Sequence, residues 1–194
     1  PEIRRADTVI ARFNSSLLAM WPTYLMIVLI YMVGWMIYLQ LSFVLADDGI
    51  GSPAVQANIV SVSSVMHLVG GLAYGRVTAR IGQRWMLFSV LSMMAASDLL
   101  VGVGHGVPTM MAAVGLSGLG GGNMLIFLTN FLLERAPDIG RARAIGFMFA
   151  AMYIGEFLNP FILTPLRHLI GNHEAFALVG VGLLIAAVVQ GFGR

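Results

Sequence analysis

One carboxylate lies deep within a long apolar run of the sequence. Glu156 falls near the middle of residues 144–166, roughly 15 Å from either end if the run is helical. A charged side chain at that depth costs about 2.5–3.5 kcal/mol, so it usually faces a cavity or a partner. An apolar setting penalises only the charged form, which suits a group that binds and releases a proton. Glu156 is therefore a proton-coupling candidate. The alternative is a protonated Glu that bonds another helix, and Tyr153 and Asn159 lie one turn away on either side.

Two other ionisable residues lie within apolar runs. His67 shares a helical face with Gly71 and Tyr74, and it is the second proton-coupling candidate. A membrane histidine is equally often an interhelical hydrogen-bond donor, and the sequence leaves both readings open. Asp98 lies nearer one end of its run, where we expect it to reach the membrane interface or to pair with His105.

Aromatic and amide side chains recur at helical spacing in two of the apolar runs. An aromatic face can line a pocket for a lipophilic substrate, although such faces more often serve packing. Amides in apolar surroundings need partners, which are either other helices or substrate. The substrate-cavity candidates are Tyr31, Trp35, Tyr38, Asn123, Phe127 and Asn130.

Six apolar runs must position these residues. A helix that spans a bilayer needs about 20 mainly apolar residues. The chain of 194 residues is 58% hydrophobic and 10% charged, whereas a soluble domain has about 25% charged residues. The runs are too long for strands and lack a period of two. The sequence predicts an all-α membrane protein with helices at about 21–45, 53–74, 85–103, 107–133, 144–166 and 175–192.

The arginines predict the orientation of these helices. The chain has no Lys, and with the N-terminus inside, every Arg except Arg167 faces the cytoplasm. Both termini are then cytoplasmic. Residues 1–17 are polar and resemble no signal peptide, so we expect a cytoplasmic linker before a six-helix unit at 18–194. The chain begins with Pro1, which indicates a piece of a longer protein.

The stretch that joins the second and third runs carries a specific pattern. It reads Gly-Arg-Val-Thr-Ala-Arg-Ile-Gly-Gln-Arg from residue 75 to 84. This resembles the loop signature of the major facilitator superfamily, with Ala79 in place of an Asp and Gln83 in place of an Arg. The degenerate form is similar to the copy in the C-terminal half of the family. The matching residues are Gly75, Arg80, Gly82 and Arg84.

Two later stretches resemble the drug-efflux and proton-antiporter group of that family. One is Leu-Glu-Arg-Ala-Pro at 133–137, followed by Arg-Ala-Arg-Ala-Ile-Gly at 141–146, and the other is Gly-Glu-Phe-Leu-Asn-Pro at 155–160. The resemblance implies one half of a twelve-helix fold, built as two three-helix inverted repeats in the bacterial inner membrane. It also implies alternating-access transport, expected here to be proton-coupled efflux of lipophilic compounds. The implied partners are a small-molecule substrate, protons, lipid and a missing N-terminal half.

Two other classes of membrane protein remain as alternatives, an intramembrane protease and a non-transporting scaffold. Gly-Leu-Ser-Gly at 115–118 resembles the nucleophile motif of rhomboid intramembrane proteases, but the sixth run lacks the histidine base. A non-transporting scaffold would not need Glu156. We therefore expect no enzyme activity, and no metal cluster, phosphate loop or cofactor motif is evident. The formal net charge of +2 argues against nucleic acid, and the chain has no Cys.

Overall fold

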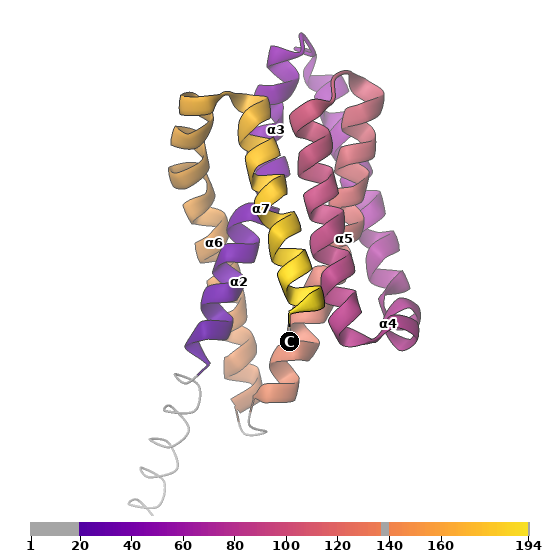
Figure 1. The fold of residues 1–194 in the computed structure, drawn as a ribbon, viewed down its shortest axis with the longest axis vertical. Helices are drawn as coiled ribbons and strands as arrows, with labels where there is room; N and C mark the ends of the chain where they lie inside the picture. The colour runs from indigo at the N-terminus through magenta and orange to yellow at the C-terminus, as the bar shows by residue number, and fades with distance from the viewer. Residues whose placement is uncertain (1–19, 137–139, 194) are drawn as a thin grey trace, which may run out of the picture.

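A computed structural model describes residues 20–136 and 140–193, and this part of the chain is helical apart from short connections (Figure 1). The prediction of an all-α protein is confirmed for these residues. Five helical stretches are long and apolar enough to cross a membrane, with α2 and α3 counted together. The helices are α2 (Trp21–Gly34), α3 (Met36–Asp47), α4 (Pro53–Val103), α5 (Val107–Arg135), α6 (Arg141–Ile170) and α7 (Asn172–Phe192).

Helix α4 covers both the second and the third predicted runs. The stretch 75–84, which we expected as a loop, is helical except at Gly82, where φ is 79° and ψ is 164°. A positive φ of this size is easily adopted only by glycine. Gly82 therefore divides α4 into a first limb, residues 53–81, and a second limb, residues 83–103.

The first limb of α4 runs parallel to α5. A Cβ added at Gly118 would lie 2.3 Å from the carbonyl oxygen of Ser63. A Cβ added at Gly122 would lie 2.0 Å from the carbonyl oxygen of His67. The residue numbers of the contacting positions therefore increase together along both helices, as they do in a parallel pair. The glycines of α5 let the backbones of the two helices touch, and α5 is one uninterrupted helix.

The second limb runs antiparallel to α5. The Ser97 hydroxyl donates to the Ala113 carbonyl at 2.7 Å. One turn earlier in the limb, Met94 lies against Gly120 of α5. The residue numbers of contacting positions now decrease along α4 while they increase along α5, so this limb is antiparallel to α5. The two limbs of α4 therefore run in opposite directions. Figure 1 shows the resulting hairpin of α4, whose turn lies at the lower end of the bundle.

The remaining helix bounds follow local chemistry. Proline occupies the first turn of α2, α4 and α5, where its missing N–H is harmless. Trp35, with φ of −85° and ψ of 0°, separates α2 from α3 within the run predicted as one helix. Helix α6 extends from Arg141 to Ile170, beyond the expected 144–166. The linker 1–17 lies outside the described residues.

Charged residues are distributed unequally between the two ends of the bundle. The turn of α4, the end of α5 and the start of α6 lie at the lower end in Figure 1, with the start of α2 and the end of α7. All described arginines except Arg167 belong to these segments. They are Arg76, Arg80, Arg84, Arg135, Arg141 and Arg143.

The opposite end carries an ionic cluster around Asp48. Burial raises the pKa of this carboxyl group. The hydrogen bonds from His105 and from the Gly106 N–H, together with the charges of His173 and His105, outweigh burial and lower the pKa below its usual value. The expected pairing of Asp98 with His105 is not formed, because His105 instead contacts Asp48 at 2.8 Å. Asp98 is buried at 5% exposure.

Two hydrophobic clusters form the core and lie at different depths. One includes Met86, Val90 and Leu132 toward the Arg-rich end. The other includes Leu45 and Phe176 toward the opposite end. The middle of the bundle, between these clusters, holds the candidate site described next.

Candidate functional site

A cavity of about 450 Å³ lies at the middle of the helices. This volume is within the 300–1,000 Å³ typical of small-molecule sites. Its walls come from five helices and are mainly apolar. The lining residues are Ile30, Tyr31, Gly34, Trp35 and Tyr38 from α2, α3 and the Trp35 junction, Ser64, His67 and Met94 from α4, Ser117, Gly121, Met124 and Leu125 from α5, and Met152 from α6.

The aromatic wall of this cavity forms where α2 gives way to α3. The helical break at Trp35 falls at the cavity itself, and the Trp35 and Tyr38 rings pack with centroids 4.9 Å apart. The Tyr38 hydroxyl hydrogen-bonds to the hydroxyl of Ser63 on α4. The structure therefore brings three of the predicted cavity residues, Tyr31, Trp35 and Tyr38, together on one wall.

The opposite wall holds His67 and depends on the glycines of α5. A Cβ added at Gly121 would lie 3.1 Å from the imidazole ring, so a larger residue would crowd the ring. Ser117 of α5 and Met94 of the second α4 limb complete this wall. The structure thus places His67, a proton-coupling candidate, in the same cavity as the aromatic residues.

Glu156 lies beside the cavity rather than in its lining. It is partly buried on α6, one turn beyond Met152, which does line the cavity. Tyr153 and Asn159, which were expected to hydrogen-bond to Glu156, do not do so. Tyr153 is 67% exposed, and the side chain of Asn159 contacts Gln40 and the Met32 carbonyl.

The bond between Gln40 and Asn159 is a feature that sequence reasoning missed. The Gln40 amide donates to the Asn159 side-chain oxygen at 3.1 Å, and the Asn159 amide donates to the Met32 carbonyl at 2.6 Å. Both side chains are at most 2% exposed. An amide within an apolar run signals that a partner is needed, but it does not name the partner. This pair fixes α3 against α6 one helical turn beyond Glu156, toward the C-terminal end of α6.

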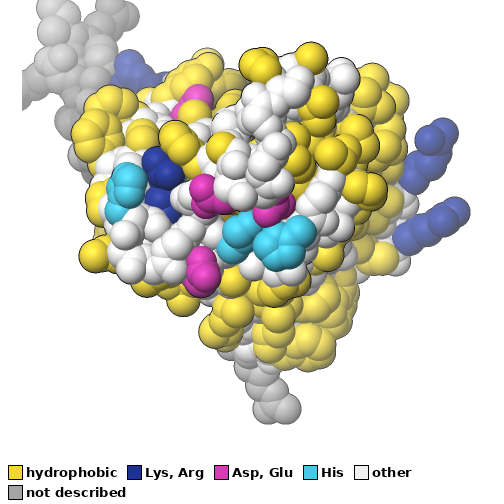
Figure 2. Space-filling view, turned by 90° about the horizontal axis from the view of Figure 1, so that it is seen from above, with side chains coloured by type: hydrophobic (Ala, Val, Ile, Leu, Met, Phe, Trp, Pro, Cys, Tyr) yellow, Lys and Arg dark blue, Asp and Glu magenta, His cyan; other side chains and the backbone are white. Residues whose placement is uncertain are grey.

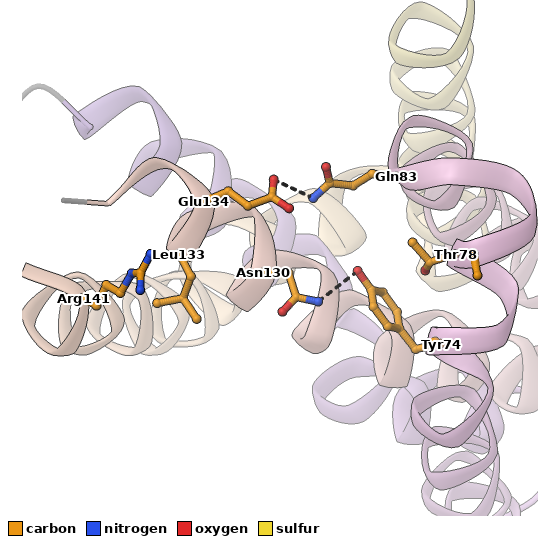
Figure 3. A pocket seen from close by; sticks show the side chains of 9 residues that line it. Tyr74, Thr78, Gln83, Asn130, Leu133, Glu134 and Arg141 are labelled. Carbon is orange, nitrogen blue, oxygen red and sulfur yellow. Dashed lines mark hydrogen bonds between the residues drawn. The ribbon is translucent and has the colours of Figure 1, made fainter. Parts of the chain in front are cut away.

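A second pocket, of about 560 Å³, lies at the Arg-rich end between the first limb of α4 and α5 (Figure 3). Asn130, expected in the central cavity, lines this pocket instead and donates to the Tyr74 hydroxyl at 3.4 Å. Gln83 donates to Glu134 at 3.3 Å across the same pocket. These bonds tie the α4 turn to the end of α5.

The family-like loop residues surround this turn. Gly82 makes the turn, and Gly75 lines the second pocket. The Arg84 guanidinium donates to the Gly193 carbonyl at 2.5 Å, which joins the turn to the end of α7. Arg80 is exposed.

Two other predicted cavity residues serve helix packing. Asn123 is 5% exposed and donates to the Leu119 carbonyl one turn earlier in α5. Phe127 is 2% exposed, belongs to the core and stacks on Phe131. The sequence showed that these residues share one face of a helix. It did not show whether that face packs against other helices or lines a cavity.

The protease alternative gains no support from the site. Ser117 lines the central cavity, but within the described residues no hydrogen bond joins it to a histidine. His173, in the first turn of α7, bonds to Asp48 and to the Val101 carbonyl. A serine nucleophile needs a base within hydrogen-bond reach.

The comparisons with known proteins agree with this architecture. Residues 23–192 match the model of the Major Facilitator Superfamily. The chain is 25% identical over 131 residues to the 4-hydroxybenzoate transporter PcaK of Pseudomonas aeruginosa, which covers 68% of this chain and 29% of that protein. The chain therefore spans less than a third of the length of this curated relative.

A similar fold occurs in a solved structure of a peptide transporter, POT, a mutant in complex with sulfate. The TM-score is 0.61 at 17% identity, covering 90% of this chain and 36% of that one. The family match spans nearly all the described helices, including the Gly82 turn and both walls of the cavity. The chain belongs to the major facilitator superfamily.

Proposed function

We propose that this chain forms part of an alternating-access transporter that exports lipophilic or weakly polar small molecules in exchange for protons. Membership of the family supports membrane transport. The observation that carries the finer proposal is the central cavity, which combines an aromatic wall with Met152, one helical turn from Glu156 on α6. Substrate would bind in the cavity, and Glu156 with His67 would carry the coupled proton.

The chemistry of the cavity favours a substrate without a full charge. No Arg, Asp or Glu belongs to its lining, and His67 is its single ionisable side chain apart from the two tyrosines. An isolated charge is costly to bury without a partner of opposite sign. The name of the relative favours a second candidate, an aromatic acid, for which His67 would be the counter-charge.

Replacement of Trp35 by Ala is expected to weaken binding of a lipophilic dye about tenfold. The indole is a main part of the cavity wall, and a buried aromatic anchor commonly contributes more than about 1 kcal/mol to binding. Isothermal titration calorimetry of the dye into purified protein measures the affinity without using tryptophan as the reporter. Trp21→Ala is the control, because Trp21 is 63% exposed at the far end of α2.

An unchanged dye affinity in Trp35→Ala would place the binding site outside this cavity. The same titration with 4-hydroxybenzoate separates the two substrate classes. Tighter binding of the acid than of the neutral dye, lost in His67→Ala, would favour the second candidate.

We further propose six membrane crossings in two three-helix inverted repeats, with both termini in the cytoplasm. The two antiparallel limbs of α4 supply two crossings, and α2 with α3 supplies one. The asymmetry of the arginines supports the orientation. A second six-helix unit would face the central cavity, as in the twelve-helix family fold.

Single cysteines test this topology, since the chain has none of its own. In intact cells we expect an impermeant thiol reagent to label cysteine at Gly51 but not at Ala79 or Ala142, all three of which are exposed in the structure. Permeabilised cells should show labelling at every position. Labelling of Ala79→Cys from outside would invert the orientation, and protection of Gly51→Cys would remove a crossing.

A further inference from the structure

Three side chains that are distant in the sequence meet at the end of the bundle opposite the arginines. Asp48 follows α3, His105 lies between α4 and α5, and His173 lies in the first turn of α7. The oxygen Oδ1 of Asp48 is 2.8 Å from Nδ1 of His105 and 3.2 Å from Nε2 of His173. The three atoms lie within 4.8 Å of one another. Figure 2 looks onto this end and shows histidine side chains beside acidic ones.

The hydrogen bonds around this cluster set the tautomer of His173. Its Nδ1 lies 2.8 Å from the Val101 carbonyl oxygen, which can only accept. Nδ1 therefore carries a hydrogen, and in the neutral ring the lone pair of Nε2 points at the Asp48 carboxylate. Two acceptors facing each other at 3.2 Å need a cation between them, either a proton or a metal ion.

Hydrogen bonds to surrounding backbone groups hold the side chains of the cluster in place, as they do for the ligands of metal sites. A metal-binding histidine usually donates its other ring N–H to a carbonyl or carboxylate, as His173 does to Val101. The second Asp48 oxygen accepts from the Gly106 N–H at 3.4 Å, which orients the carboxylate. These contacts leave two imidazole nitrogens beside one carboxylate oxygen, with the three atoms within 4.8 Å of one another.

We propose that Asp48, His105 and His173 bind a divalent transition-metal ion of the zinc type, with water as the fourth ligand. Bonds of about 2.0–2.1 Å in a tetrahedron separate ligand atoms by roughly 3.3 Å, close to the observed 2.8 and 3.2 Å. Two imidazoles and one carboxylate suit zinc, whereas magnesium and calcium take oxygen ligands.

The exposure of the three side chains fits an ion that enters from the solvent. The Asp48 and His173 side chains are 9% and 17% exposed, whereas that of His105 is 70% exposed. The less exposed side chains of Asp48 and His173 would be held in place, and the exposed side chain of His105 would close over the ion. The ion would then join three connections, after α3, before α5 and at the start of α7, at one end of the transporter.

Calorimetry with zinc chloride tests this site in protein purified through a tag without histidines. We expect one zinc ion to bind per chain, and cobalt to give the intense visible absorption of a four-coordinate site. His105→Ala should weaken zinc binding by more than about a hundredfold, beyond the 10- to 100-fold that losing an outer contact costs. Because His105 is largely exposed, this variant should still fold.

Matched controls come from the same end of the molecule. Asp48→Asn should lose zinc binding, whereas Asp47→Asn should keep it, because Asp47 contacts Asn172 instead. His168→Ala removes an exposed histidine outside the cluster and should also bind normally. Absence of zinc binding in the unsubstituted protein would overturn the proposal and leave a protonated His173 as the cation. Equal binding by His105→Ala, or equal affinity for calcium, would overturn it as well.

Discussion

Replacement of Glu156 by Gln is expected to abolish substrate transport driven by a proton gradient. Gln keeps the shape of the side chain and most of its hydrogen-bonding capacity but cannot ionise. A carboxylate that moves between wet and dry surroundings couples proton binding to the conformational change, because desolvation penalises only its charged form. Without that group, the gradient has no means of biasing the two conformations.

The measurement is substrate flux into liposomes that contain the protein, with an imposed pH difference. A gradient of about one pH unit supplies about 1.4 kcal/mol per proton, enough for roughly tenfold accumulation. In Glu156→Gln this accumulation should fall to that of protein-free liposomes. Dye binding should remain, because Glu156 is outside the cavity lining.

Two variants make this result interpretable. Glu174→Gln removes an exposed carboxylate at the start of α7 and should leave gradient-driven flux intact. His67→Gln tests the other proton-coupling candidate, inside the cavity. Normal gradient-driven flux in Glu156→Gln would make Glu156 a packing residue, and a loss confined to His67→Gln would assign the proton to His67.

Substitution of Gly122 by Ala is expected to separate the first limb of α4 from α5 and strongly reduce stability. The new Cβ would lie 2.0 Å from the His67 carbonyl oxygen and 3.0 Å from the Gly71 nitrogen. Both atoms belong to the backbone, so no side-chain rotation relieves the overlap. Overpacking costs about 1–3 kcal/mol, occasionally more, which corresponds to a fall in Tm of roughly 5 °C or more in a chain of this size.

Thermal unfolding followed by size-exclusion chromatography in detergent checks this effect. Gly118→Ala should behave similarly, because its Cβ would lie 2.3 Å from the Ser63 carbonyl oxygen. Gly146→Ala and Gly182→Ala are the controls, since an added Cβ at either position meets nothing within 4 Å. A Tm for Gly122→Ala equal to that of the controls would contradict the close packing of α4 and α5.

Features that depend on residue type along a single segment could be predicted from the sequence. Apolar runs of about 20 residues predict helices, because lipid leaves the backbone no other hydrogen-bonding partner. Each predicted run is helical in the structure, although Trp35 divides the first and α4 joins the second and third. The loop pattern that ends in Gly82 and Arg84 resembles the family that the comparisons confirm. Tyr31 and Trp35, predicted as cavity residues, line the central cavity of the structure.

The packing of one helix on another could not be predicted in the same way. A helical face shows which residues point in one direction, but not which neighbour they meet. Phe127 and Asn123 therefore pack within the bundle, while Asn130 lines a pocket at its end. The helical break at Trp35 follows Gly34, but a single Gly in an apolar run does not by itself predict a break.

The cluster of Asp48, His105 and His173 depends most completely on the tertiary structure. The three residues lie in separate connections, and no spacing along the sequence predicts that they meet. Their meeting requires α4 to fold back at Gly82 and α7 to return alongside the second limb of α4. The sequence supplied the residue types, and the antiparallel arrangement of the helices brought their side chains together, because alternate connections of a helical bundle lie at the same end.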